Sequence, residues 1–338
     1  MTPADASPEL STSMIRMNGS KLAPLLPIAT AIAYPWGLTA FHSTILSGNR
    51  IGAAIWLIVA FGLPLSCLAL AASGGSWLTP SARRLAYAGV TTPPLFVLVG
   101  VASGLFKSPV PERVTWVTGW IAAGVLASFI KSKVTTVATP SASRLQIAHG
   151  ISAAIILLFL TFHLFNHLAG LIGPDTHARI MALGRRVYRS SLVEPVLVSL
   201  LLFQVISGVR LAWRWSHRAM DLPRAIQVGS GAYLAAFVLT HLNSALISAR
   251  MVHHIDTGWG WASGGRAGLI LDAWNIRLVP HYALGVFFVL THIACGLRSV
   301  LLAHGTRKPV ANRILWACMS FAAVLSVAIL AGLCGARV

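Results

Sequence analysis

Four histidines lie inside long apolar runs of the sequence, at His163, His241, His281 and His292. A polar, ionisable side chain is unfavourable in an apolar solvent unless it has a partner, so each one points to a hydrogen bond or to a bound ligand. A neutral imidazole offers one nitrogen that can coordinate a metal ion. The residue types therefore direct attention to metal-centre chemistry within apolar helices.

The elements that must position these histidines are long apolar helices. Of the 338 residues, 56% are hydrophobic and 10% are charged, and the mean hydropathy is +0.75, which is too apolar for a water-soluble surface. We predict an all-α, polytopic membrane protein with about nine transmembrane helices, each long enough to cross ~30 Å of hydrocarbon. The expected spans are 23–47, 51–73, 85–106, 114–131, 146–172, 192–213, 227–249, 278–299 and 314–335.

The charge of the chain is strongly positive, at +18, with 26 Lys and Arg against eight acidic residues. The basic residues lie in short loops between the apolar runs, which is typical of orientation charges in a membrane protein and argues against a nucleic-acid partner. The distribution favours a cytoplasmic N-terminus in a bacterial inner (cytoplasmic) membrane. The four cysteines form no C-x-x-C motif, which argues against c-type haem, iron–sulfur clusters and zinc.

The polar stretch from Lys131 to Arg144 is the clearest boundary in the chain. We expect an N-terminal tail at 1–22 and a four-helix membrane region of unknown role at 23–132, which contains a single histidine, His42. The other eleven of the twelve histidines follow the boundary. A four-helix histidine-rich region at 144–300 and a C-terminal transmembrane helix within 312–338 complete the predicted organisation.

The depths of the histidines suggest what they bind. His163 on the fifth expected span and His241 on the seventh lie at similar depth on helices that run in the same direction, so their imidazoles can approach one haem iron from opposite sides. A second layer lies closer to the inner face, where Gln204 and His292 each precede an arginine by six residues.

Small and basic residues accompany this second layer. Gly208 and Gly296 each follow a second-layer residue by four positions, and a small residue there lets a flat macrocycle approach the backbone, although plain helix packing explains it equally. Arg210, Arg214 and Arg298 are candidates for pairing with haem propionates, and orientation charge is the alternative explanation. His281 and His292 are eleven residues apart and share one helix face.

Residues 144–300 resemble the membrane-anchor cytochrome b subunit of succinate dehydrogenase and fumarate reductase, the five-helix two-haem kind. The motifs that carry the resemblance are F-H-L-F-N-H, F-Q-V-I-S-G-V-R, Q-V-G-S-G ending in T-H, and T-H-I-A-C-G-L-R-S, in this order. The resemblance implies that His163 and His241 bind an outer haem b. It also implies an inner haem b with His292 as one ligand.

The inner site departs from the family pattern, because the chain has Gln204 where the family has a histidine. An amide oxygen is a weak donor and a poor haem ligand. The second site is therefore empty, five-coordinate through His292, or completed by His149, which lies near the inner end of the fifth span.

The resemblance further implies electron exchange between a quinone and separate iron–sulfur and flavoprotein subunits, so the chain would be one subunit of a quinone oxidoreductase. Glu194 is a candidate for the quinone site, and the alternative is a helix N-terminal charge stabilised by the helix dipole. His167 and His281 are further candidates. The chain has no nucleotide-binding or cluster-binding motif of its own, so any dicarboxylate chemistry would belong to its partners.

Two other functions remain open at this point. A transporter or channel could use the histidines as proton relays or substrate ligands, although acidic residues near the apolar core are sparse. A structural membrane protein with decayed haem sites is the other alternative, and Gln204 is the residue that allows it.

Overall fold

The computed structural model describes residues 25–73, 78–129 and 143–338. Within these ranges every regular element is a helix, and no strand is present. The N-terminal tail expected at 1–22 and most of the polar boundary segment lie outside the described residues. The all-α prediction is confirmed for the described part of the chain.

Five helices form the N-terminal membrane region: α2 (Leu25–Leu46), α3 (Arg50–Ala72), α4 (Pro80–Val90), α5 (Thr92–Leu105) and α6 (Glu112–Phe129). The third expected span is broken into α4 and α5, which meet at an angle of 65°. Pro93 and Pro94 follow the break, and because proline has no backbone N–H, a continuous hydrogen-bond ladder cannot run through it.

The remaining chain forms a second set of long helices. They are α7 (Arg144–Ala169), α9 (Val193–Trp215), α10 (Leu222–Leu242), α12 (Leu278–Ala303) and α13 (Lys308–Leu333). A π-helix, η1 (Asn243–Val252), continues α10 directly. Shorter elements between them are α8 (Pro174–Tyr188), α11 (Trp259–Ala262), and the 3-10 turns η2 (Gly265–Ala267) and η3 (Asn275–Arg277).

Six of the described helices are long and apolar enough to cross a membrane, and the bent pair α4 and α5 would make seven. The six are α3, α7, α9, α10 with η1, η3 with α12, and α13. Helices α2 and α6 form where spans were expected but are not among the six, so a total of nine transmembrane helices remains a prediction. Large apolar side chains on the long helices are exposed at the surface of the protein. Leu158 on α7, for example, is 79% exposed, as expected for a side chain in contact with lipid.

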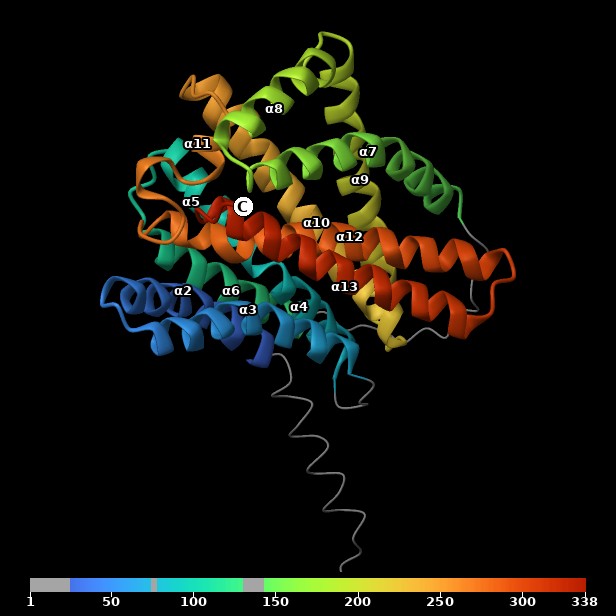
Figure 1. Ribbon diagram of the computed structural model, residues 1–338. Coiled ribbons are helices and arrows are strands. Elements are labelled where there is room, and N and C mark those ends of the chain that lie inside the picture. Colours follow the sequence, from blue (N-terminus) through green and yellow to red (C-terminus); the bar gives the residue numbers. More distant parts are fainter. Residues whose placement is uncertain (1–24, 74–77, 130–142) are drawn as a thin grey trace, which may run out of the picture.

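The two regions pack as one body. Figure 1 shows α2 and α3 side by side along one edge, α12 and α13 as a long hairpin across the middle, and α7 and α8 toward the opposite edge. Helix α10 packs against α3, α4 and α5 on one side and against α9 and α12 on the other. The Thr240 hydroxyl on α10 donates to the carbonyl oxygen of Pro94 on α5 at 3.0 Å, which connects the broken helix to the turn that carries His241.

Helix α8 is the element that the sequence analysis missed. It is only 15 residues long and mixes apolar with charged residues, with Arg185 and Arg186 in its last turn, so it has no span-length apolar run. It packs against α7 and α9, and Figure 1 shows it at the edge of the molecule beside α7. Amphipathic helices of this kind lie along a membrane surface with their apolar side toward the protein and lipid.

Candidate functional site

The histidines of α7, α10 and α12 form two facing pairs. The outer pair is His163 on α7 and His241 on α10, whose ring centres are 6.1 Å apart and whose planes meet at 73°. The inner pair is His149 on α7 and His292 on α12, with ring centres 6.3 Å apart and planes at 84°. The two pairs therefore have nearly the same separation, although they come from different combinations of helices.

This separation matches the length of a metal bridge between two imidazoles. A transition-metal ion binds an imidazole nitrogen at about 2.0 Å, and the ring centre lies ~1.1 Å further on, so two rings on opposite sides of one ion have centres about 6 Å apart. Both pairs agree with that value to within a few tenths of an ångström. The separation of each pair is thus the one that two ligands on opposite sides of a single ion would have, and it also lies within the range of ordinary edge-to-face ring packing.

Hydrogen bonds at Nδ1 orient both rings of the inner pair. His149 Nδ1 contacts the Ser207 hydroxyl of α9 at 2.8 Å. His292 Nδ1 lies 3.1 Å from both the Ser230 hydroxyl and the Gln227 carbonyl oxygen of α10. Metal-binding histidines are held in this way, with one nitrogen fixed by a neighbouring group and the other left for the metal. The Nε2 atoms of both rings make no hydrogen bond to a described residue.

A glycine follows each of these two serines and lets the ring lie against the helix. A Cβ atom at Gly208 would be 3.5 Å from the His149 ring, and one at Gly231 would be 3.0 Å from the His292 ring. Two Ser-Gly dipeptides, Ser207-Gly208 on α9 and Ser230-Gly231 on α10, therefore each hold one imidazole of the inner pair. Four helices contribute to this site, two by a histidine and two by a Ser-Gly dipeptide.

The outer pair is oriented by aromatic stacking. His163 stacks on Phe159, with ring centres 5.4 Å apart and an interplanar angle of 23°. His241 stacks on Phe237, with ring centres 5.8 Å apart and an angle of 8°. In both cases the phenyl ring belongs to the residue one helical turn earlier, so helix geometry places it beside the histidine. The described residues offer no hydrogen bond to either histidine.

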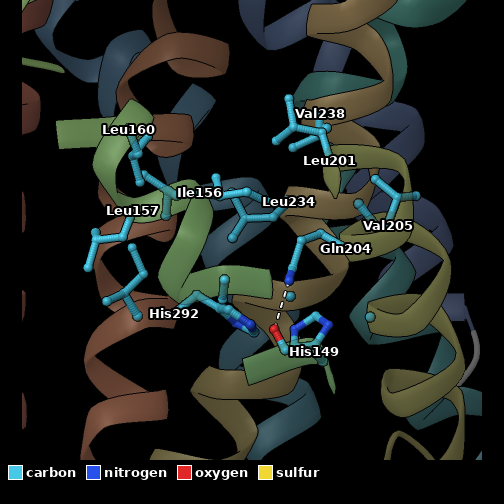
Figure 2. Close-up of a pocket in the computed structure, with 16 residues that line it drawn as sticks. His149, Ile156, Leu157, Leu160, Leu201, Gln204, Val205, Leu234, Val238 and His292 are labelled. Atoms are coloured by element: carbon cyan, nitrogen blue, oxygen red, sulfur yellow. Dashed lines mark hydrogen bonds between the residues drawn. The ribbon is translucent and has the colours of Figure 1, made fainter. Parts of the chain in front are cut away.

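Each pair lines a cavity. The outer cavity, which contains His163 and His241, has a volume of about 290 Å³, and the inner cavity, which contains His149 and His292, has a volume of about 110 Å³. Figure 2 shows His149 and His292 together at one end of the inner cavity, below a set of Leu, Ile and Val side chains. Those side chains also form the wall of the outer cavity, so the two cavities adjoin: Ile156, Leu160, Leu201, Leu234, Val238 and Val289 line both.

Gln204, which the resemblance sets at a position where that family has a histidine, makes hydrogen bonds to α7. Its amide nitrogen donates to the carbonyl oxygen of His149 at 2.8 Å (Figure 2). The same nitrogen donates to the Ser152 hydroxyl at 2.6 Å. The side chain lines the inner cavity, where it connects α9 to the turn that carries His149. The structure therefore places His149, and not Gln204, opposite His292.

Three other predicted site residues lie away from both cavity linings. Arg298 donates from Nε to the Asn312 side chain at 2.8 Å and lies 3.8 Å from Asp221, so it connects α12 to α13 and to the start of α10. Arg210 is exposed on α9. Gly296 meets no neighbouring side chain, whereas Gly208 lines the inner cavity.

Glu194 lines the outer cavity and is paired with Arg250 of η1. Its two carboxylate oxygens accept hydrogen bonds from the two terminal guanidinium nitrogens of Arg250. The bond from Nη2 to Oε2 is 3.3 Å long. Arg185 and Arg189 line the same end, where Arg189 donates to the Thr257 hydroxyl at 2.7 Å. The end of the outer cavity nearest α8 is thus rich in positive charge.

A further polar cluster lines the outer cavity at this end: Asn166 and His167 of α7 and His177 of α8. The His167 ring lies between His163, at 4.7 Å between ring centres, and His177, at 5.5 Å. Burial, together with the nearby positive charge of Arg185, lowers the pKa of His177 to about 4, so this imidazole is neutral at physiological pH. His281 is buried on α12 and packs against Phe237 with the two rings tilted by 35°, but it lies outside both cavity linings.

Sequence reasoning named three of the four paired histidines as candidate haem ligands and kept His149 as one of three options. It missed the Ser-Gly dipeptides, although their repetition in the second and third motifs of the resembling region was a usable signal. It also missed the cluster around His177, because α8 was not expected. Among the described residues, no group of three or more His, Cys, Asp or Glu side chains is arranged to hold a metal ion.

Comparisons of the chain with protein-family models, with curated proteins and with solved structures find no match.

Proposed function

We propose that this chain is a membrane-bound b-type cytochrome that binds two haems, one between His163 and His241 and one between His149 and His292. The observation that carries the proposal is the equal spacing of the two imidazole pairs, 6.1 and 6.3 Å between ring centres. A haem needs only two protein ligands, because its porphyrin supplies the other four nitrogens. Haem iron, when bound, would supply one-electron transfer.

The residues around each pair fit such a group. At the inner pair, Ser207 and Ser230 fix the Nδ1 side of each ring and leave Nε2 for the iron. At the outer pair, Phe159 and Phe237 hold the rings by stacking. Apolar Leu, Ile and Val side chains line the space between the pairs and would exclude water from a flat apolar macrocycle.

The distance between the two pairs supports electron transfer across a bilayer. His149 and His163 lie on α7 and are 14 positions apart, which corresponds to about 21 Å along the helix axis. This distance covers most of the ~30 Å hydrocarbon thickness of a membrane. As the resemblance implies, we propose that electrons pass between a quinone at the α8 end and an iron–sulfur or flavoprotein partner at the opposite end.

The proposal is tested by the absorption spectrum of the purified protein, recorded as reduced minus oxidised. An α band in the b-type region is expected. Its intensity should fall in His163→Ala and in His241→Ala, because each variant removes one ligand of the outer haem. His42→Ala is the matched control, because His42 lies outside both cavities and, among the described residues, its Nε2 is bonded to the carbonyl oxygen of Leu271 at 3.0 Å. A flat spectrum would contradict the proposal and favour a transporter, a channel or a structural role.

A further inference from the structure

One side of helix α8 directs two arginines toward the interior of the protein. The residues of this side follow one another at four-residue spacing along α8 and its C-terminal cap, and all of them line the outer cavity: His177, Met181, Arg185 and Arg189. Arg186 of the same helix is exposed instead. A charge that only orients a helix at the membrane surface can lie on the exposed side, as Arg186 does, so the two cavity-lining arginines need another explanation.

Positive charge exceeds negative charge at this end of the cavity. Arg185, Arg189 and Arg250 line it, and Glu194 is the one carboxylate among the described residues of the lining. Glu194 is bonded through both oxygens to Arg250. Arg185 contacts Asp256, but that side chain is 69% exposed, and an exposed ion pair compensates a charge only weakly. Arg189 has no carboxylate partner within the described ranges.

The surroundings of Arg189 are unfavourable for its charge. Burial, together with the positive charges of Arg185 and Arg250, lowers the pKa of Arg189. Its guanidinium donates to the Thr257 hydroxyl at 2.7 Å. Because that hydroxyl accepts this bond, it keeps its own hydrogen for another acceptor. A negative group at this place would therefore stabilise the cation and receive a hydrogen bond from Thr257.

Two buried N–H groups beside these arginines lack an acceptor. The first is Nε of Arg185, which is buried and without a partner. The second is in His177, whose side chain is 2% exposed. The Asn166 amide nitrogen can only donate, so His177 Nε2 accepts from it at 3.2 Å and the neutral ring carries its proton on Nδ1, which is also buried and without a partner. Buried donors are normally satisfied, so the missing group is an acceptor.

One unsatisfied acceptor also lines this end of the cavity. Asn166 Oδ1 is buried and has no hydrogen-bond partner. It needs a hydroxyl or N–H donor. A hydrogen phosphate offers a hydroxyl beside its charged oxygens, and so does a phosphate that carries a glycerol head group. The set of unsatisfied atoms thus favours a phosphate group over a plain carboxylate.

We infer that Arg185, Arg189, Thr257 and His177 bind a phosphate group at the α8 end of the outer cavity. A guanidinium group is planar and can bond two oxygens of one phosphate, whereas the hydroxyl and the imidazole N–H each add a neutral donor. The phosphate is either a free ion or the head group of an anionic phospholipid, which an amphipathic helix at the membrane surface can reach. The site uses none of the proposed haem ligands, so the inference goes beyond the proposed function and does not require haem.

The test is binding of two probes to the full-length protein purified in detergent. Labelled inorganic phosphate is measured by equilibrium dialysis, and phosphatidylglycerol is measured against phosphatidylcholine by native mass spectrometry. Binding of the free ion without a preference for phosphatidylglycerol identifies a free phosphate, and the reverse identifies a lipid. Arg189→Gln and His177→Phe should weaken binding of the preferred probe by about tenfold or more, the effect of losing a hydrogen bond to a charged group. Arg186→Gln, the matched control on the exposed side, leaves binding unchanged.

A conservative variant separates binding from folding. Arg189→Lys keeps the charge and loses the planar fork, so it should bind more tightly than Arg189→Gln does. The inference is overturned if the wild type binds neither probe, if Arg189→Gln and His177→Phe bind as well as Arg186→Gln, or if Arg189→Lys and Arg189→Gln lose affinity equally. Phosphate binding that appears only in His163→Ala would assign the site to a haem propionate and would also overturn it. If the wild type contains no haem, the proposed function fails, and the phosphate measurement still decides this inference.

Discussion

His149 and His292 face each other across 6.3 Å, although they are 143 residues apart in the chain and neither belongs to the more conspicuous outer pair. Each ring is held at Nδ1 by a serine of a different helix, Ser207 or Ser230. The inner pair is thereby oriented by hydrogen bonds, whereas the outer pair is oriented by stacking on phenylalanine. This difference leads to separate expectations for the two sites.

The glycines of the two Ser-Gly dipeptides should differ in their tolerance of a methyl group. In Gly231→Ala the new Cβ would lie 3.0 Å from the His292 ring, so the ring must shift by a few tenths of an ångström, and haem affinity at the inner site should fall. Gly208→Ala is the matched control, because its Cβ would lie 3.5 Å from the His149 ring, an ordinary contact. Haem titration of both variants checks this expectation, and equal affinities would contradict it.

Gln204→Ala should keep the full haem content. The amide holds α9 against α7 through the His149 carbonyl oxygen and the Ser152 hydroxyl, so its loss should lower the free energy of unfolding by about 1–3 kcal/mol without removing an iron ligand. Haem content and thermal unfolding in detergent measure the two effects. Loss of one haem in this variant would show that Gln204 is a ligand and that His149 is not.

The helices of this protein could be predicted from sequence to within a few residues, because long apolar runs bounded by polar loops have few alternatives in a membrane. Helix α7, expected at 146–172, spans Arg144–Ala169, and α12, expected at 278–299, spans Leu278–Ala303. Helix α8 was missed because an amphipathic surface helix lacks such a run. The break between α4 and α5 was missed as well, although Pro93 and Pro94 were visible in the sequence.

The histidine pairing was only partly predictable. Depth along a helix follows from residue counting, so His163 and His241 could be placed at one level. Rotation of a helix about its axis depends on packing, and sequence alone did not show that His149 turns toward α12. The resemblance pointed instead to the α9 position that Gln204 occupies. Only the contacts among four helices show that His149, and not Gln204, faces His292.

The ion pair between Glu112 of α6 and Arg277 of η3 should stabilise the contact between the N-terminal region and the start of α12. The Arg277 side chain is 9% exposed and the Glu112 side chain 22%, so Glu112→Gln leaves a largely buried cation and should cost about 2 kcal/mol. The Arg185–Asp256 pair is the control, because Asp256 is 69% exposed and Asp256→Asn should cost less than about 1 kcal/mol. Thermal unfolding of both variants distinguishes them; equal losses would be inconsistent with burial as the cause.

Acidification should destabilise the packing of α8. The pKa of His177 is lowered from 6.5 to about 4 in the folded protein, by burial and by Arg185, so its contribution to stability is complete above pH 6.5 and is lost as the pH falls toward 4. The groups that face it are Asn166, His167, Trp259 and Arg185. His177→Leu removes this contribution. Acidification from pH 6.5 toward pH 4 should therefore lower the Tm of the parent protein more than the Tm of the variant. A constant difference would contradict the expectation.

The number of haems per polypeptide tests the central claim most directly. The account predicts two haems b in the purified wild-type protein, one in His149→Ala, one in His163→Ala and none in the double variant, with two retained in His253→Ala. A wild-type protein with fewer than two haems, or a His149→Ala variant that keeps both, would contradict it.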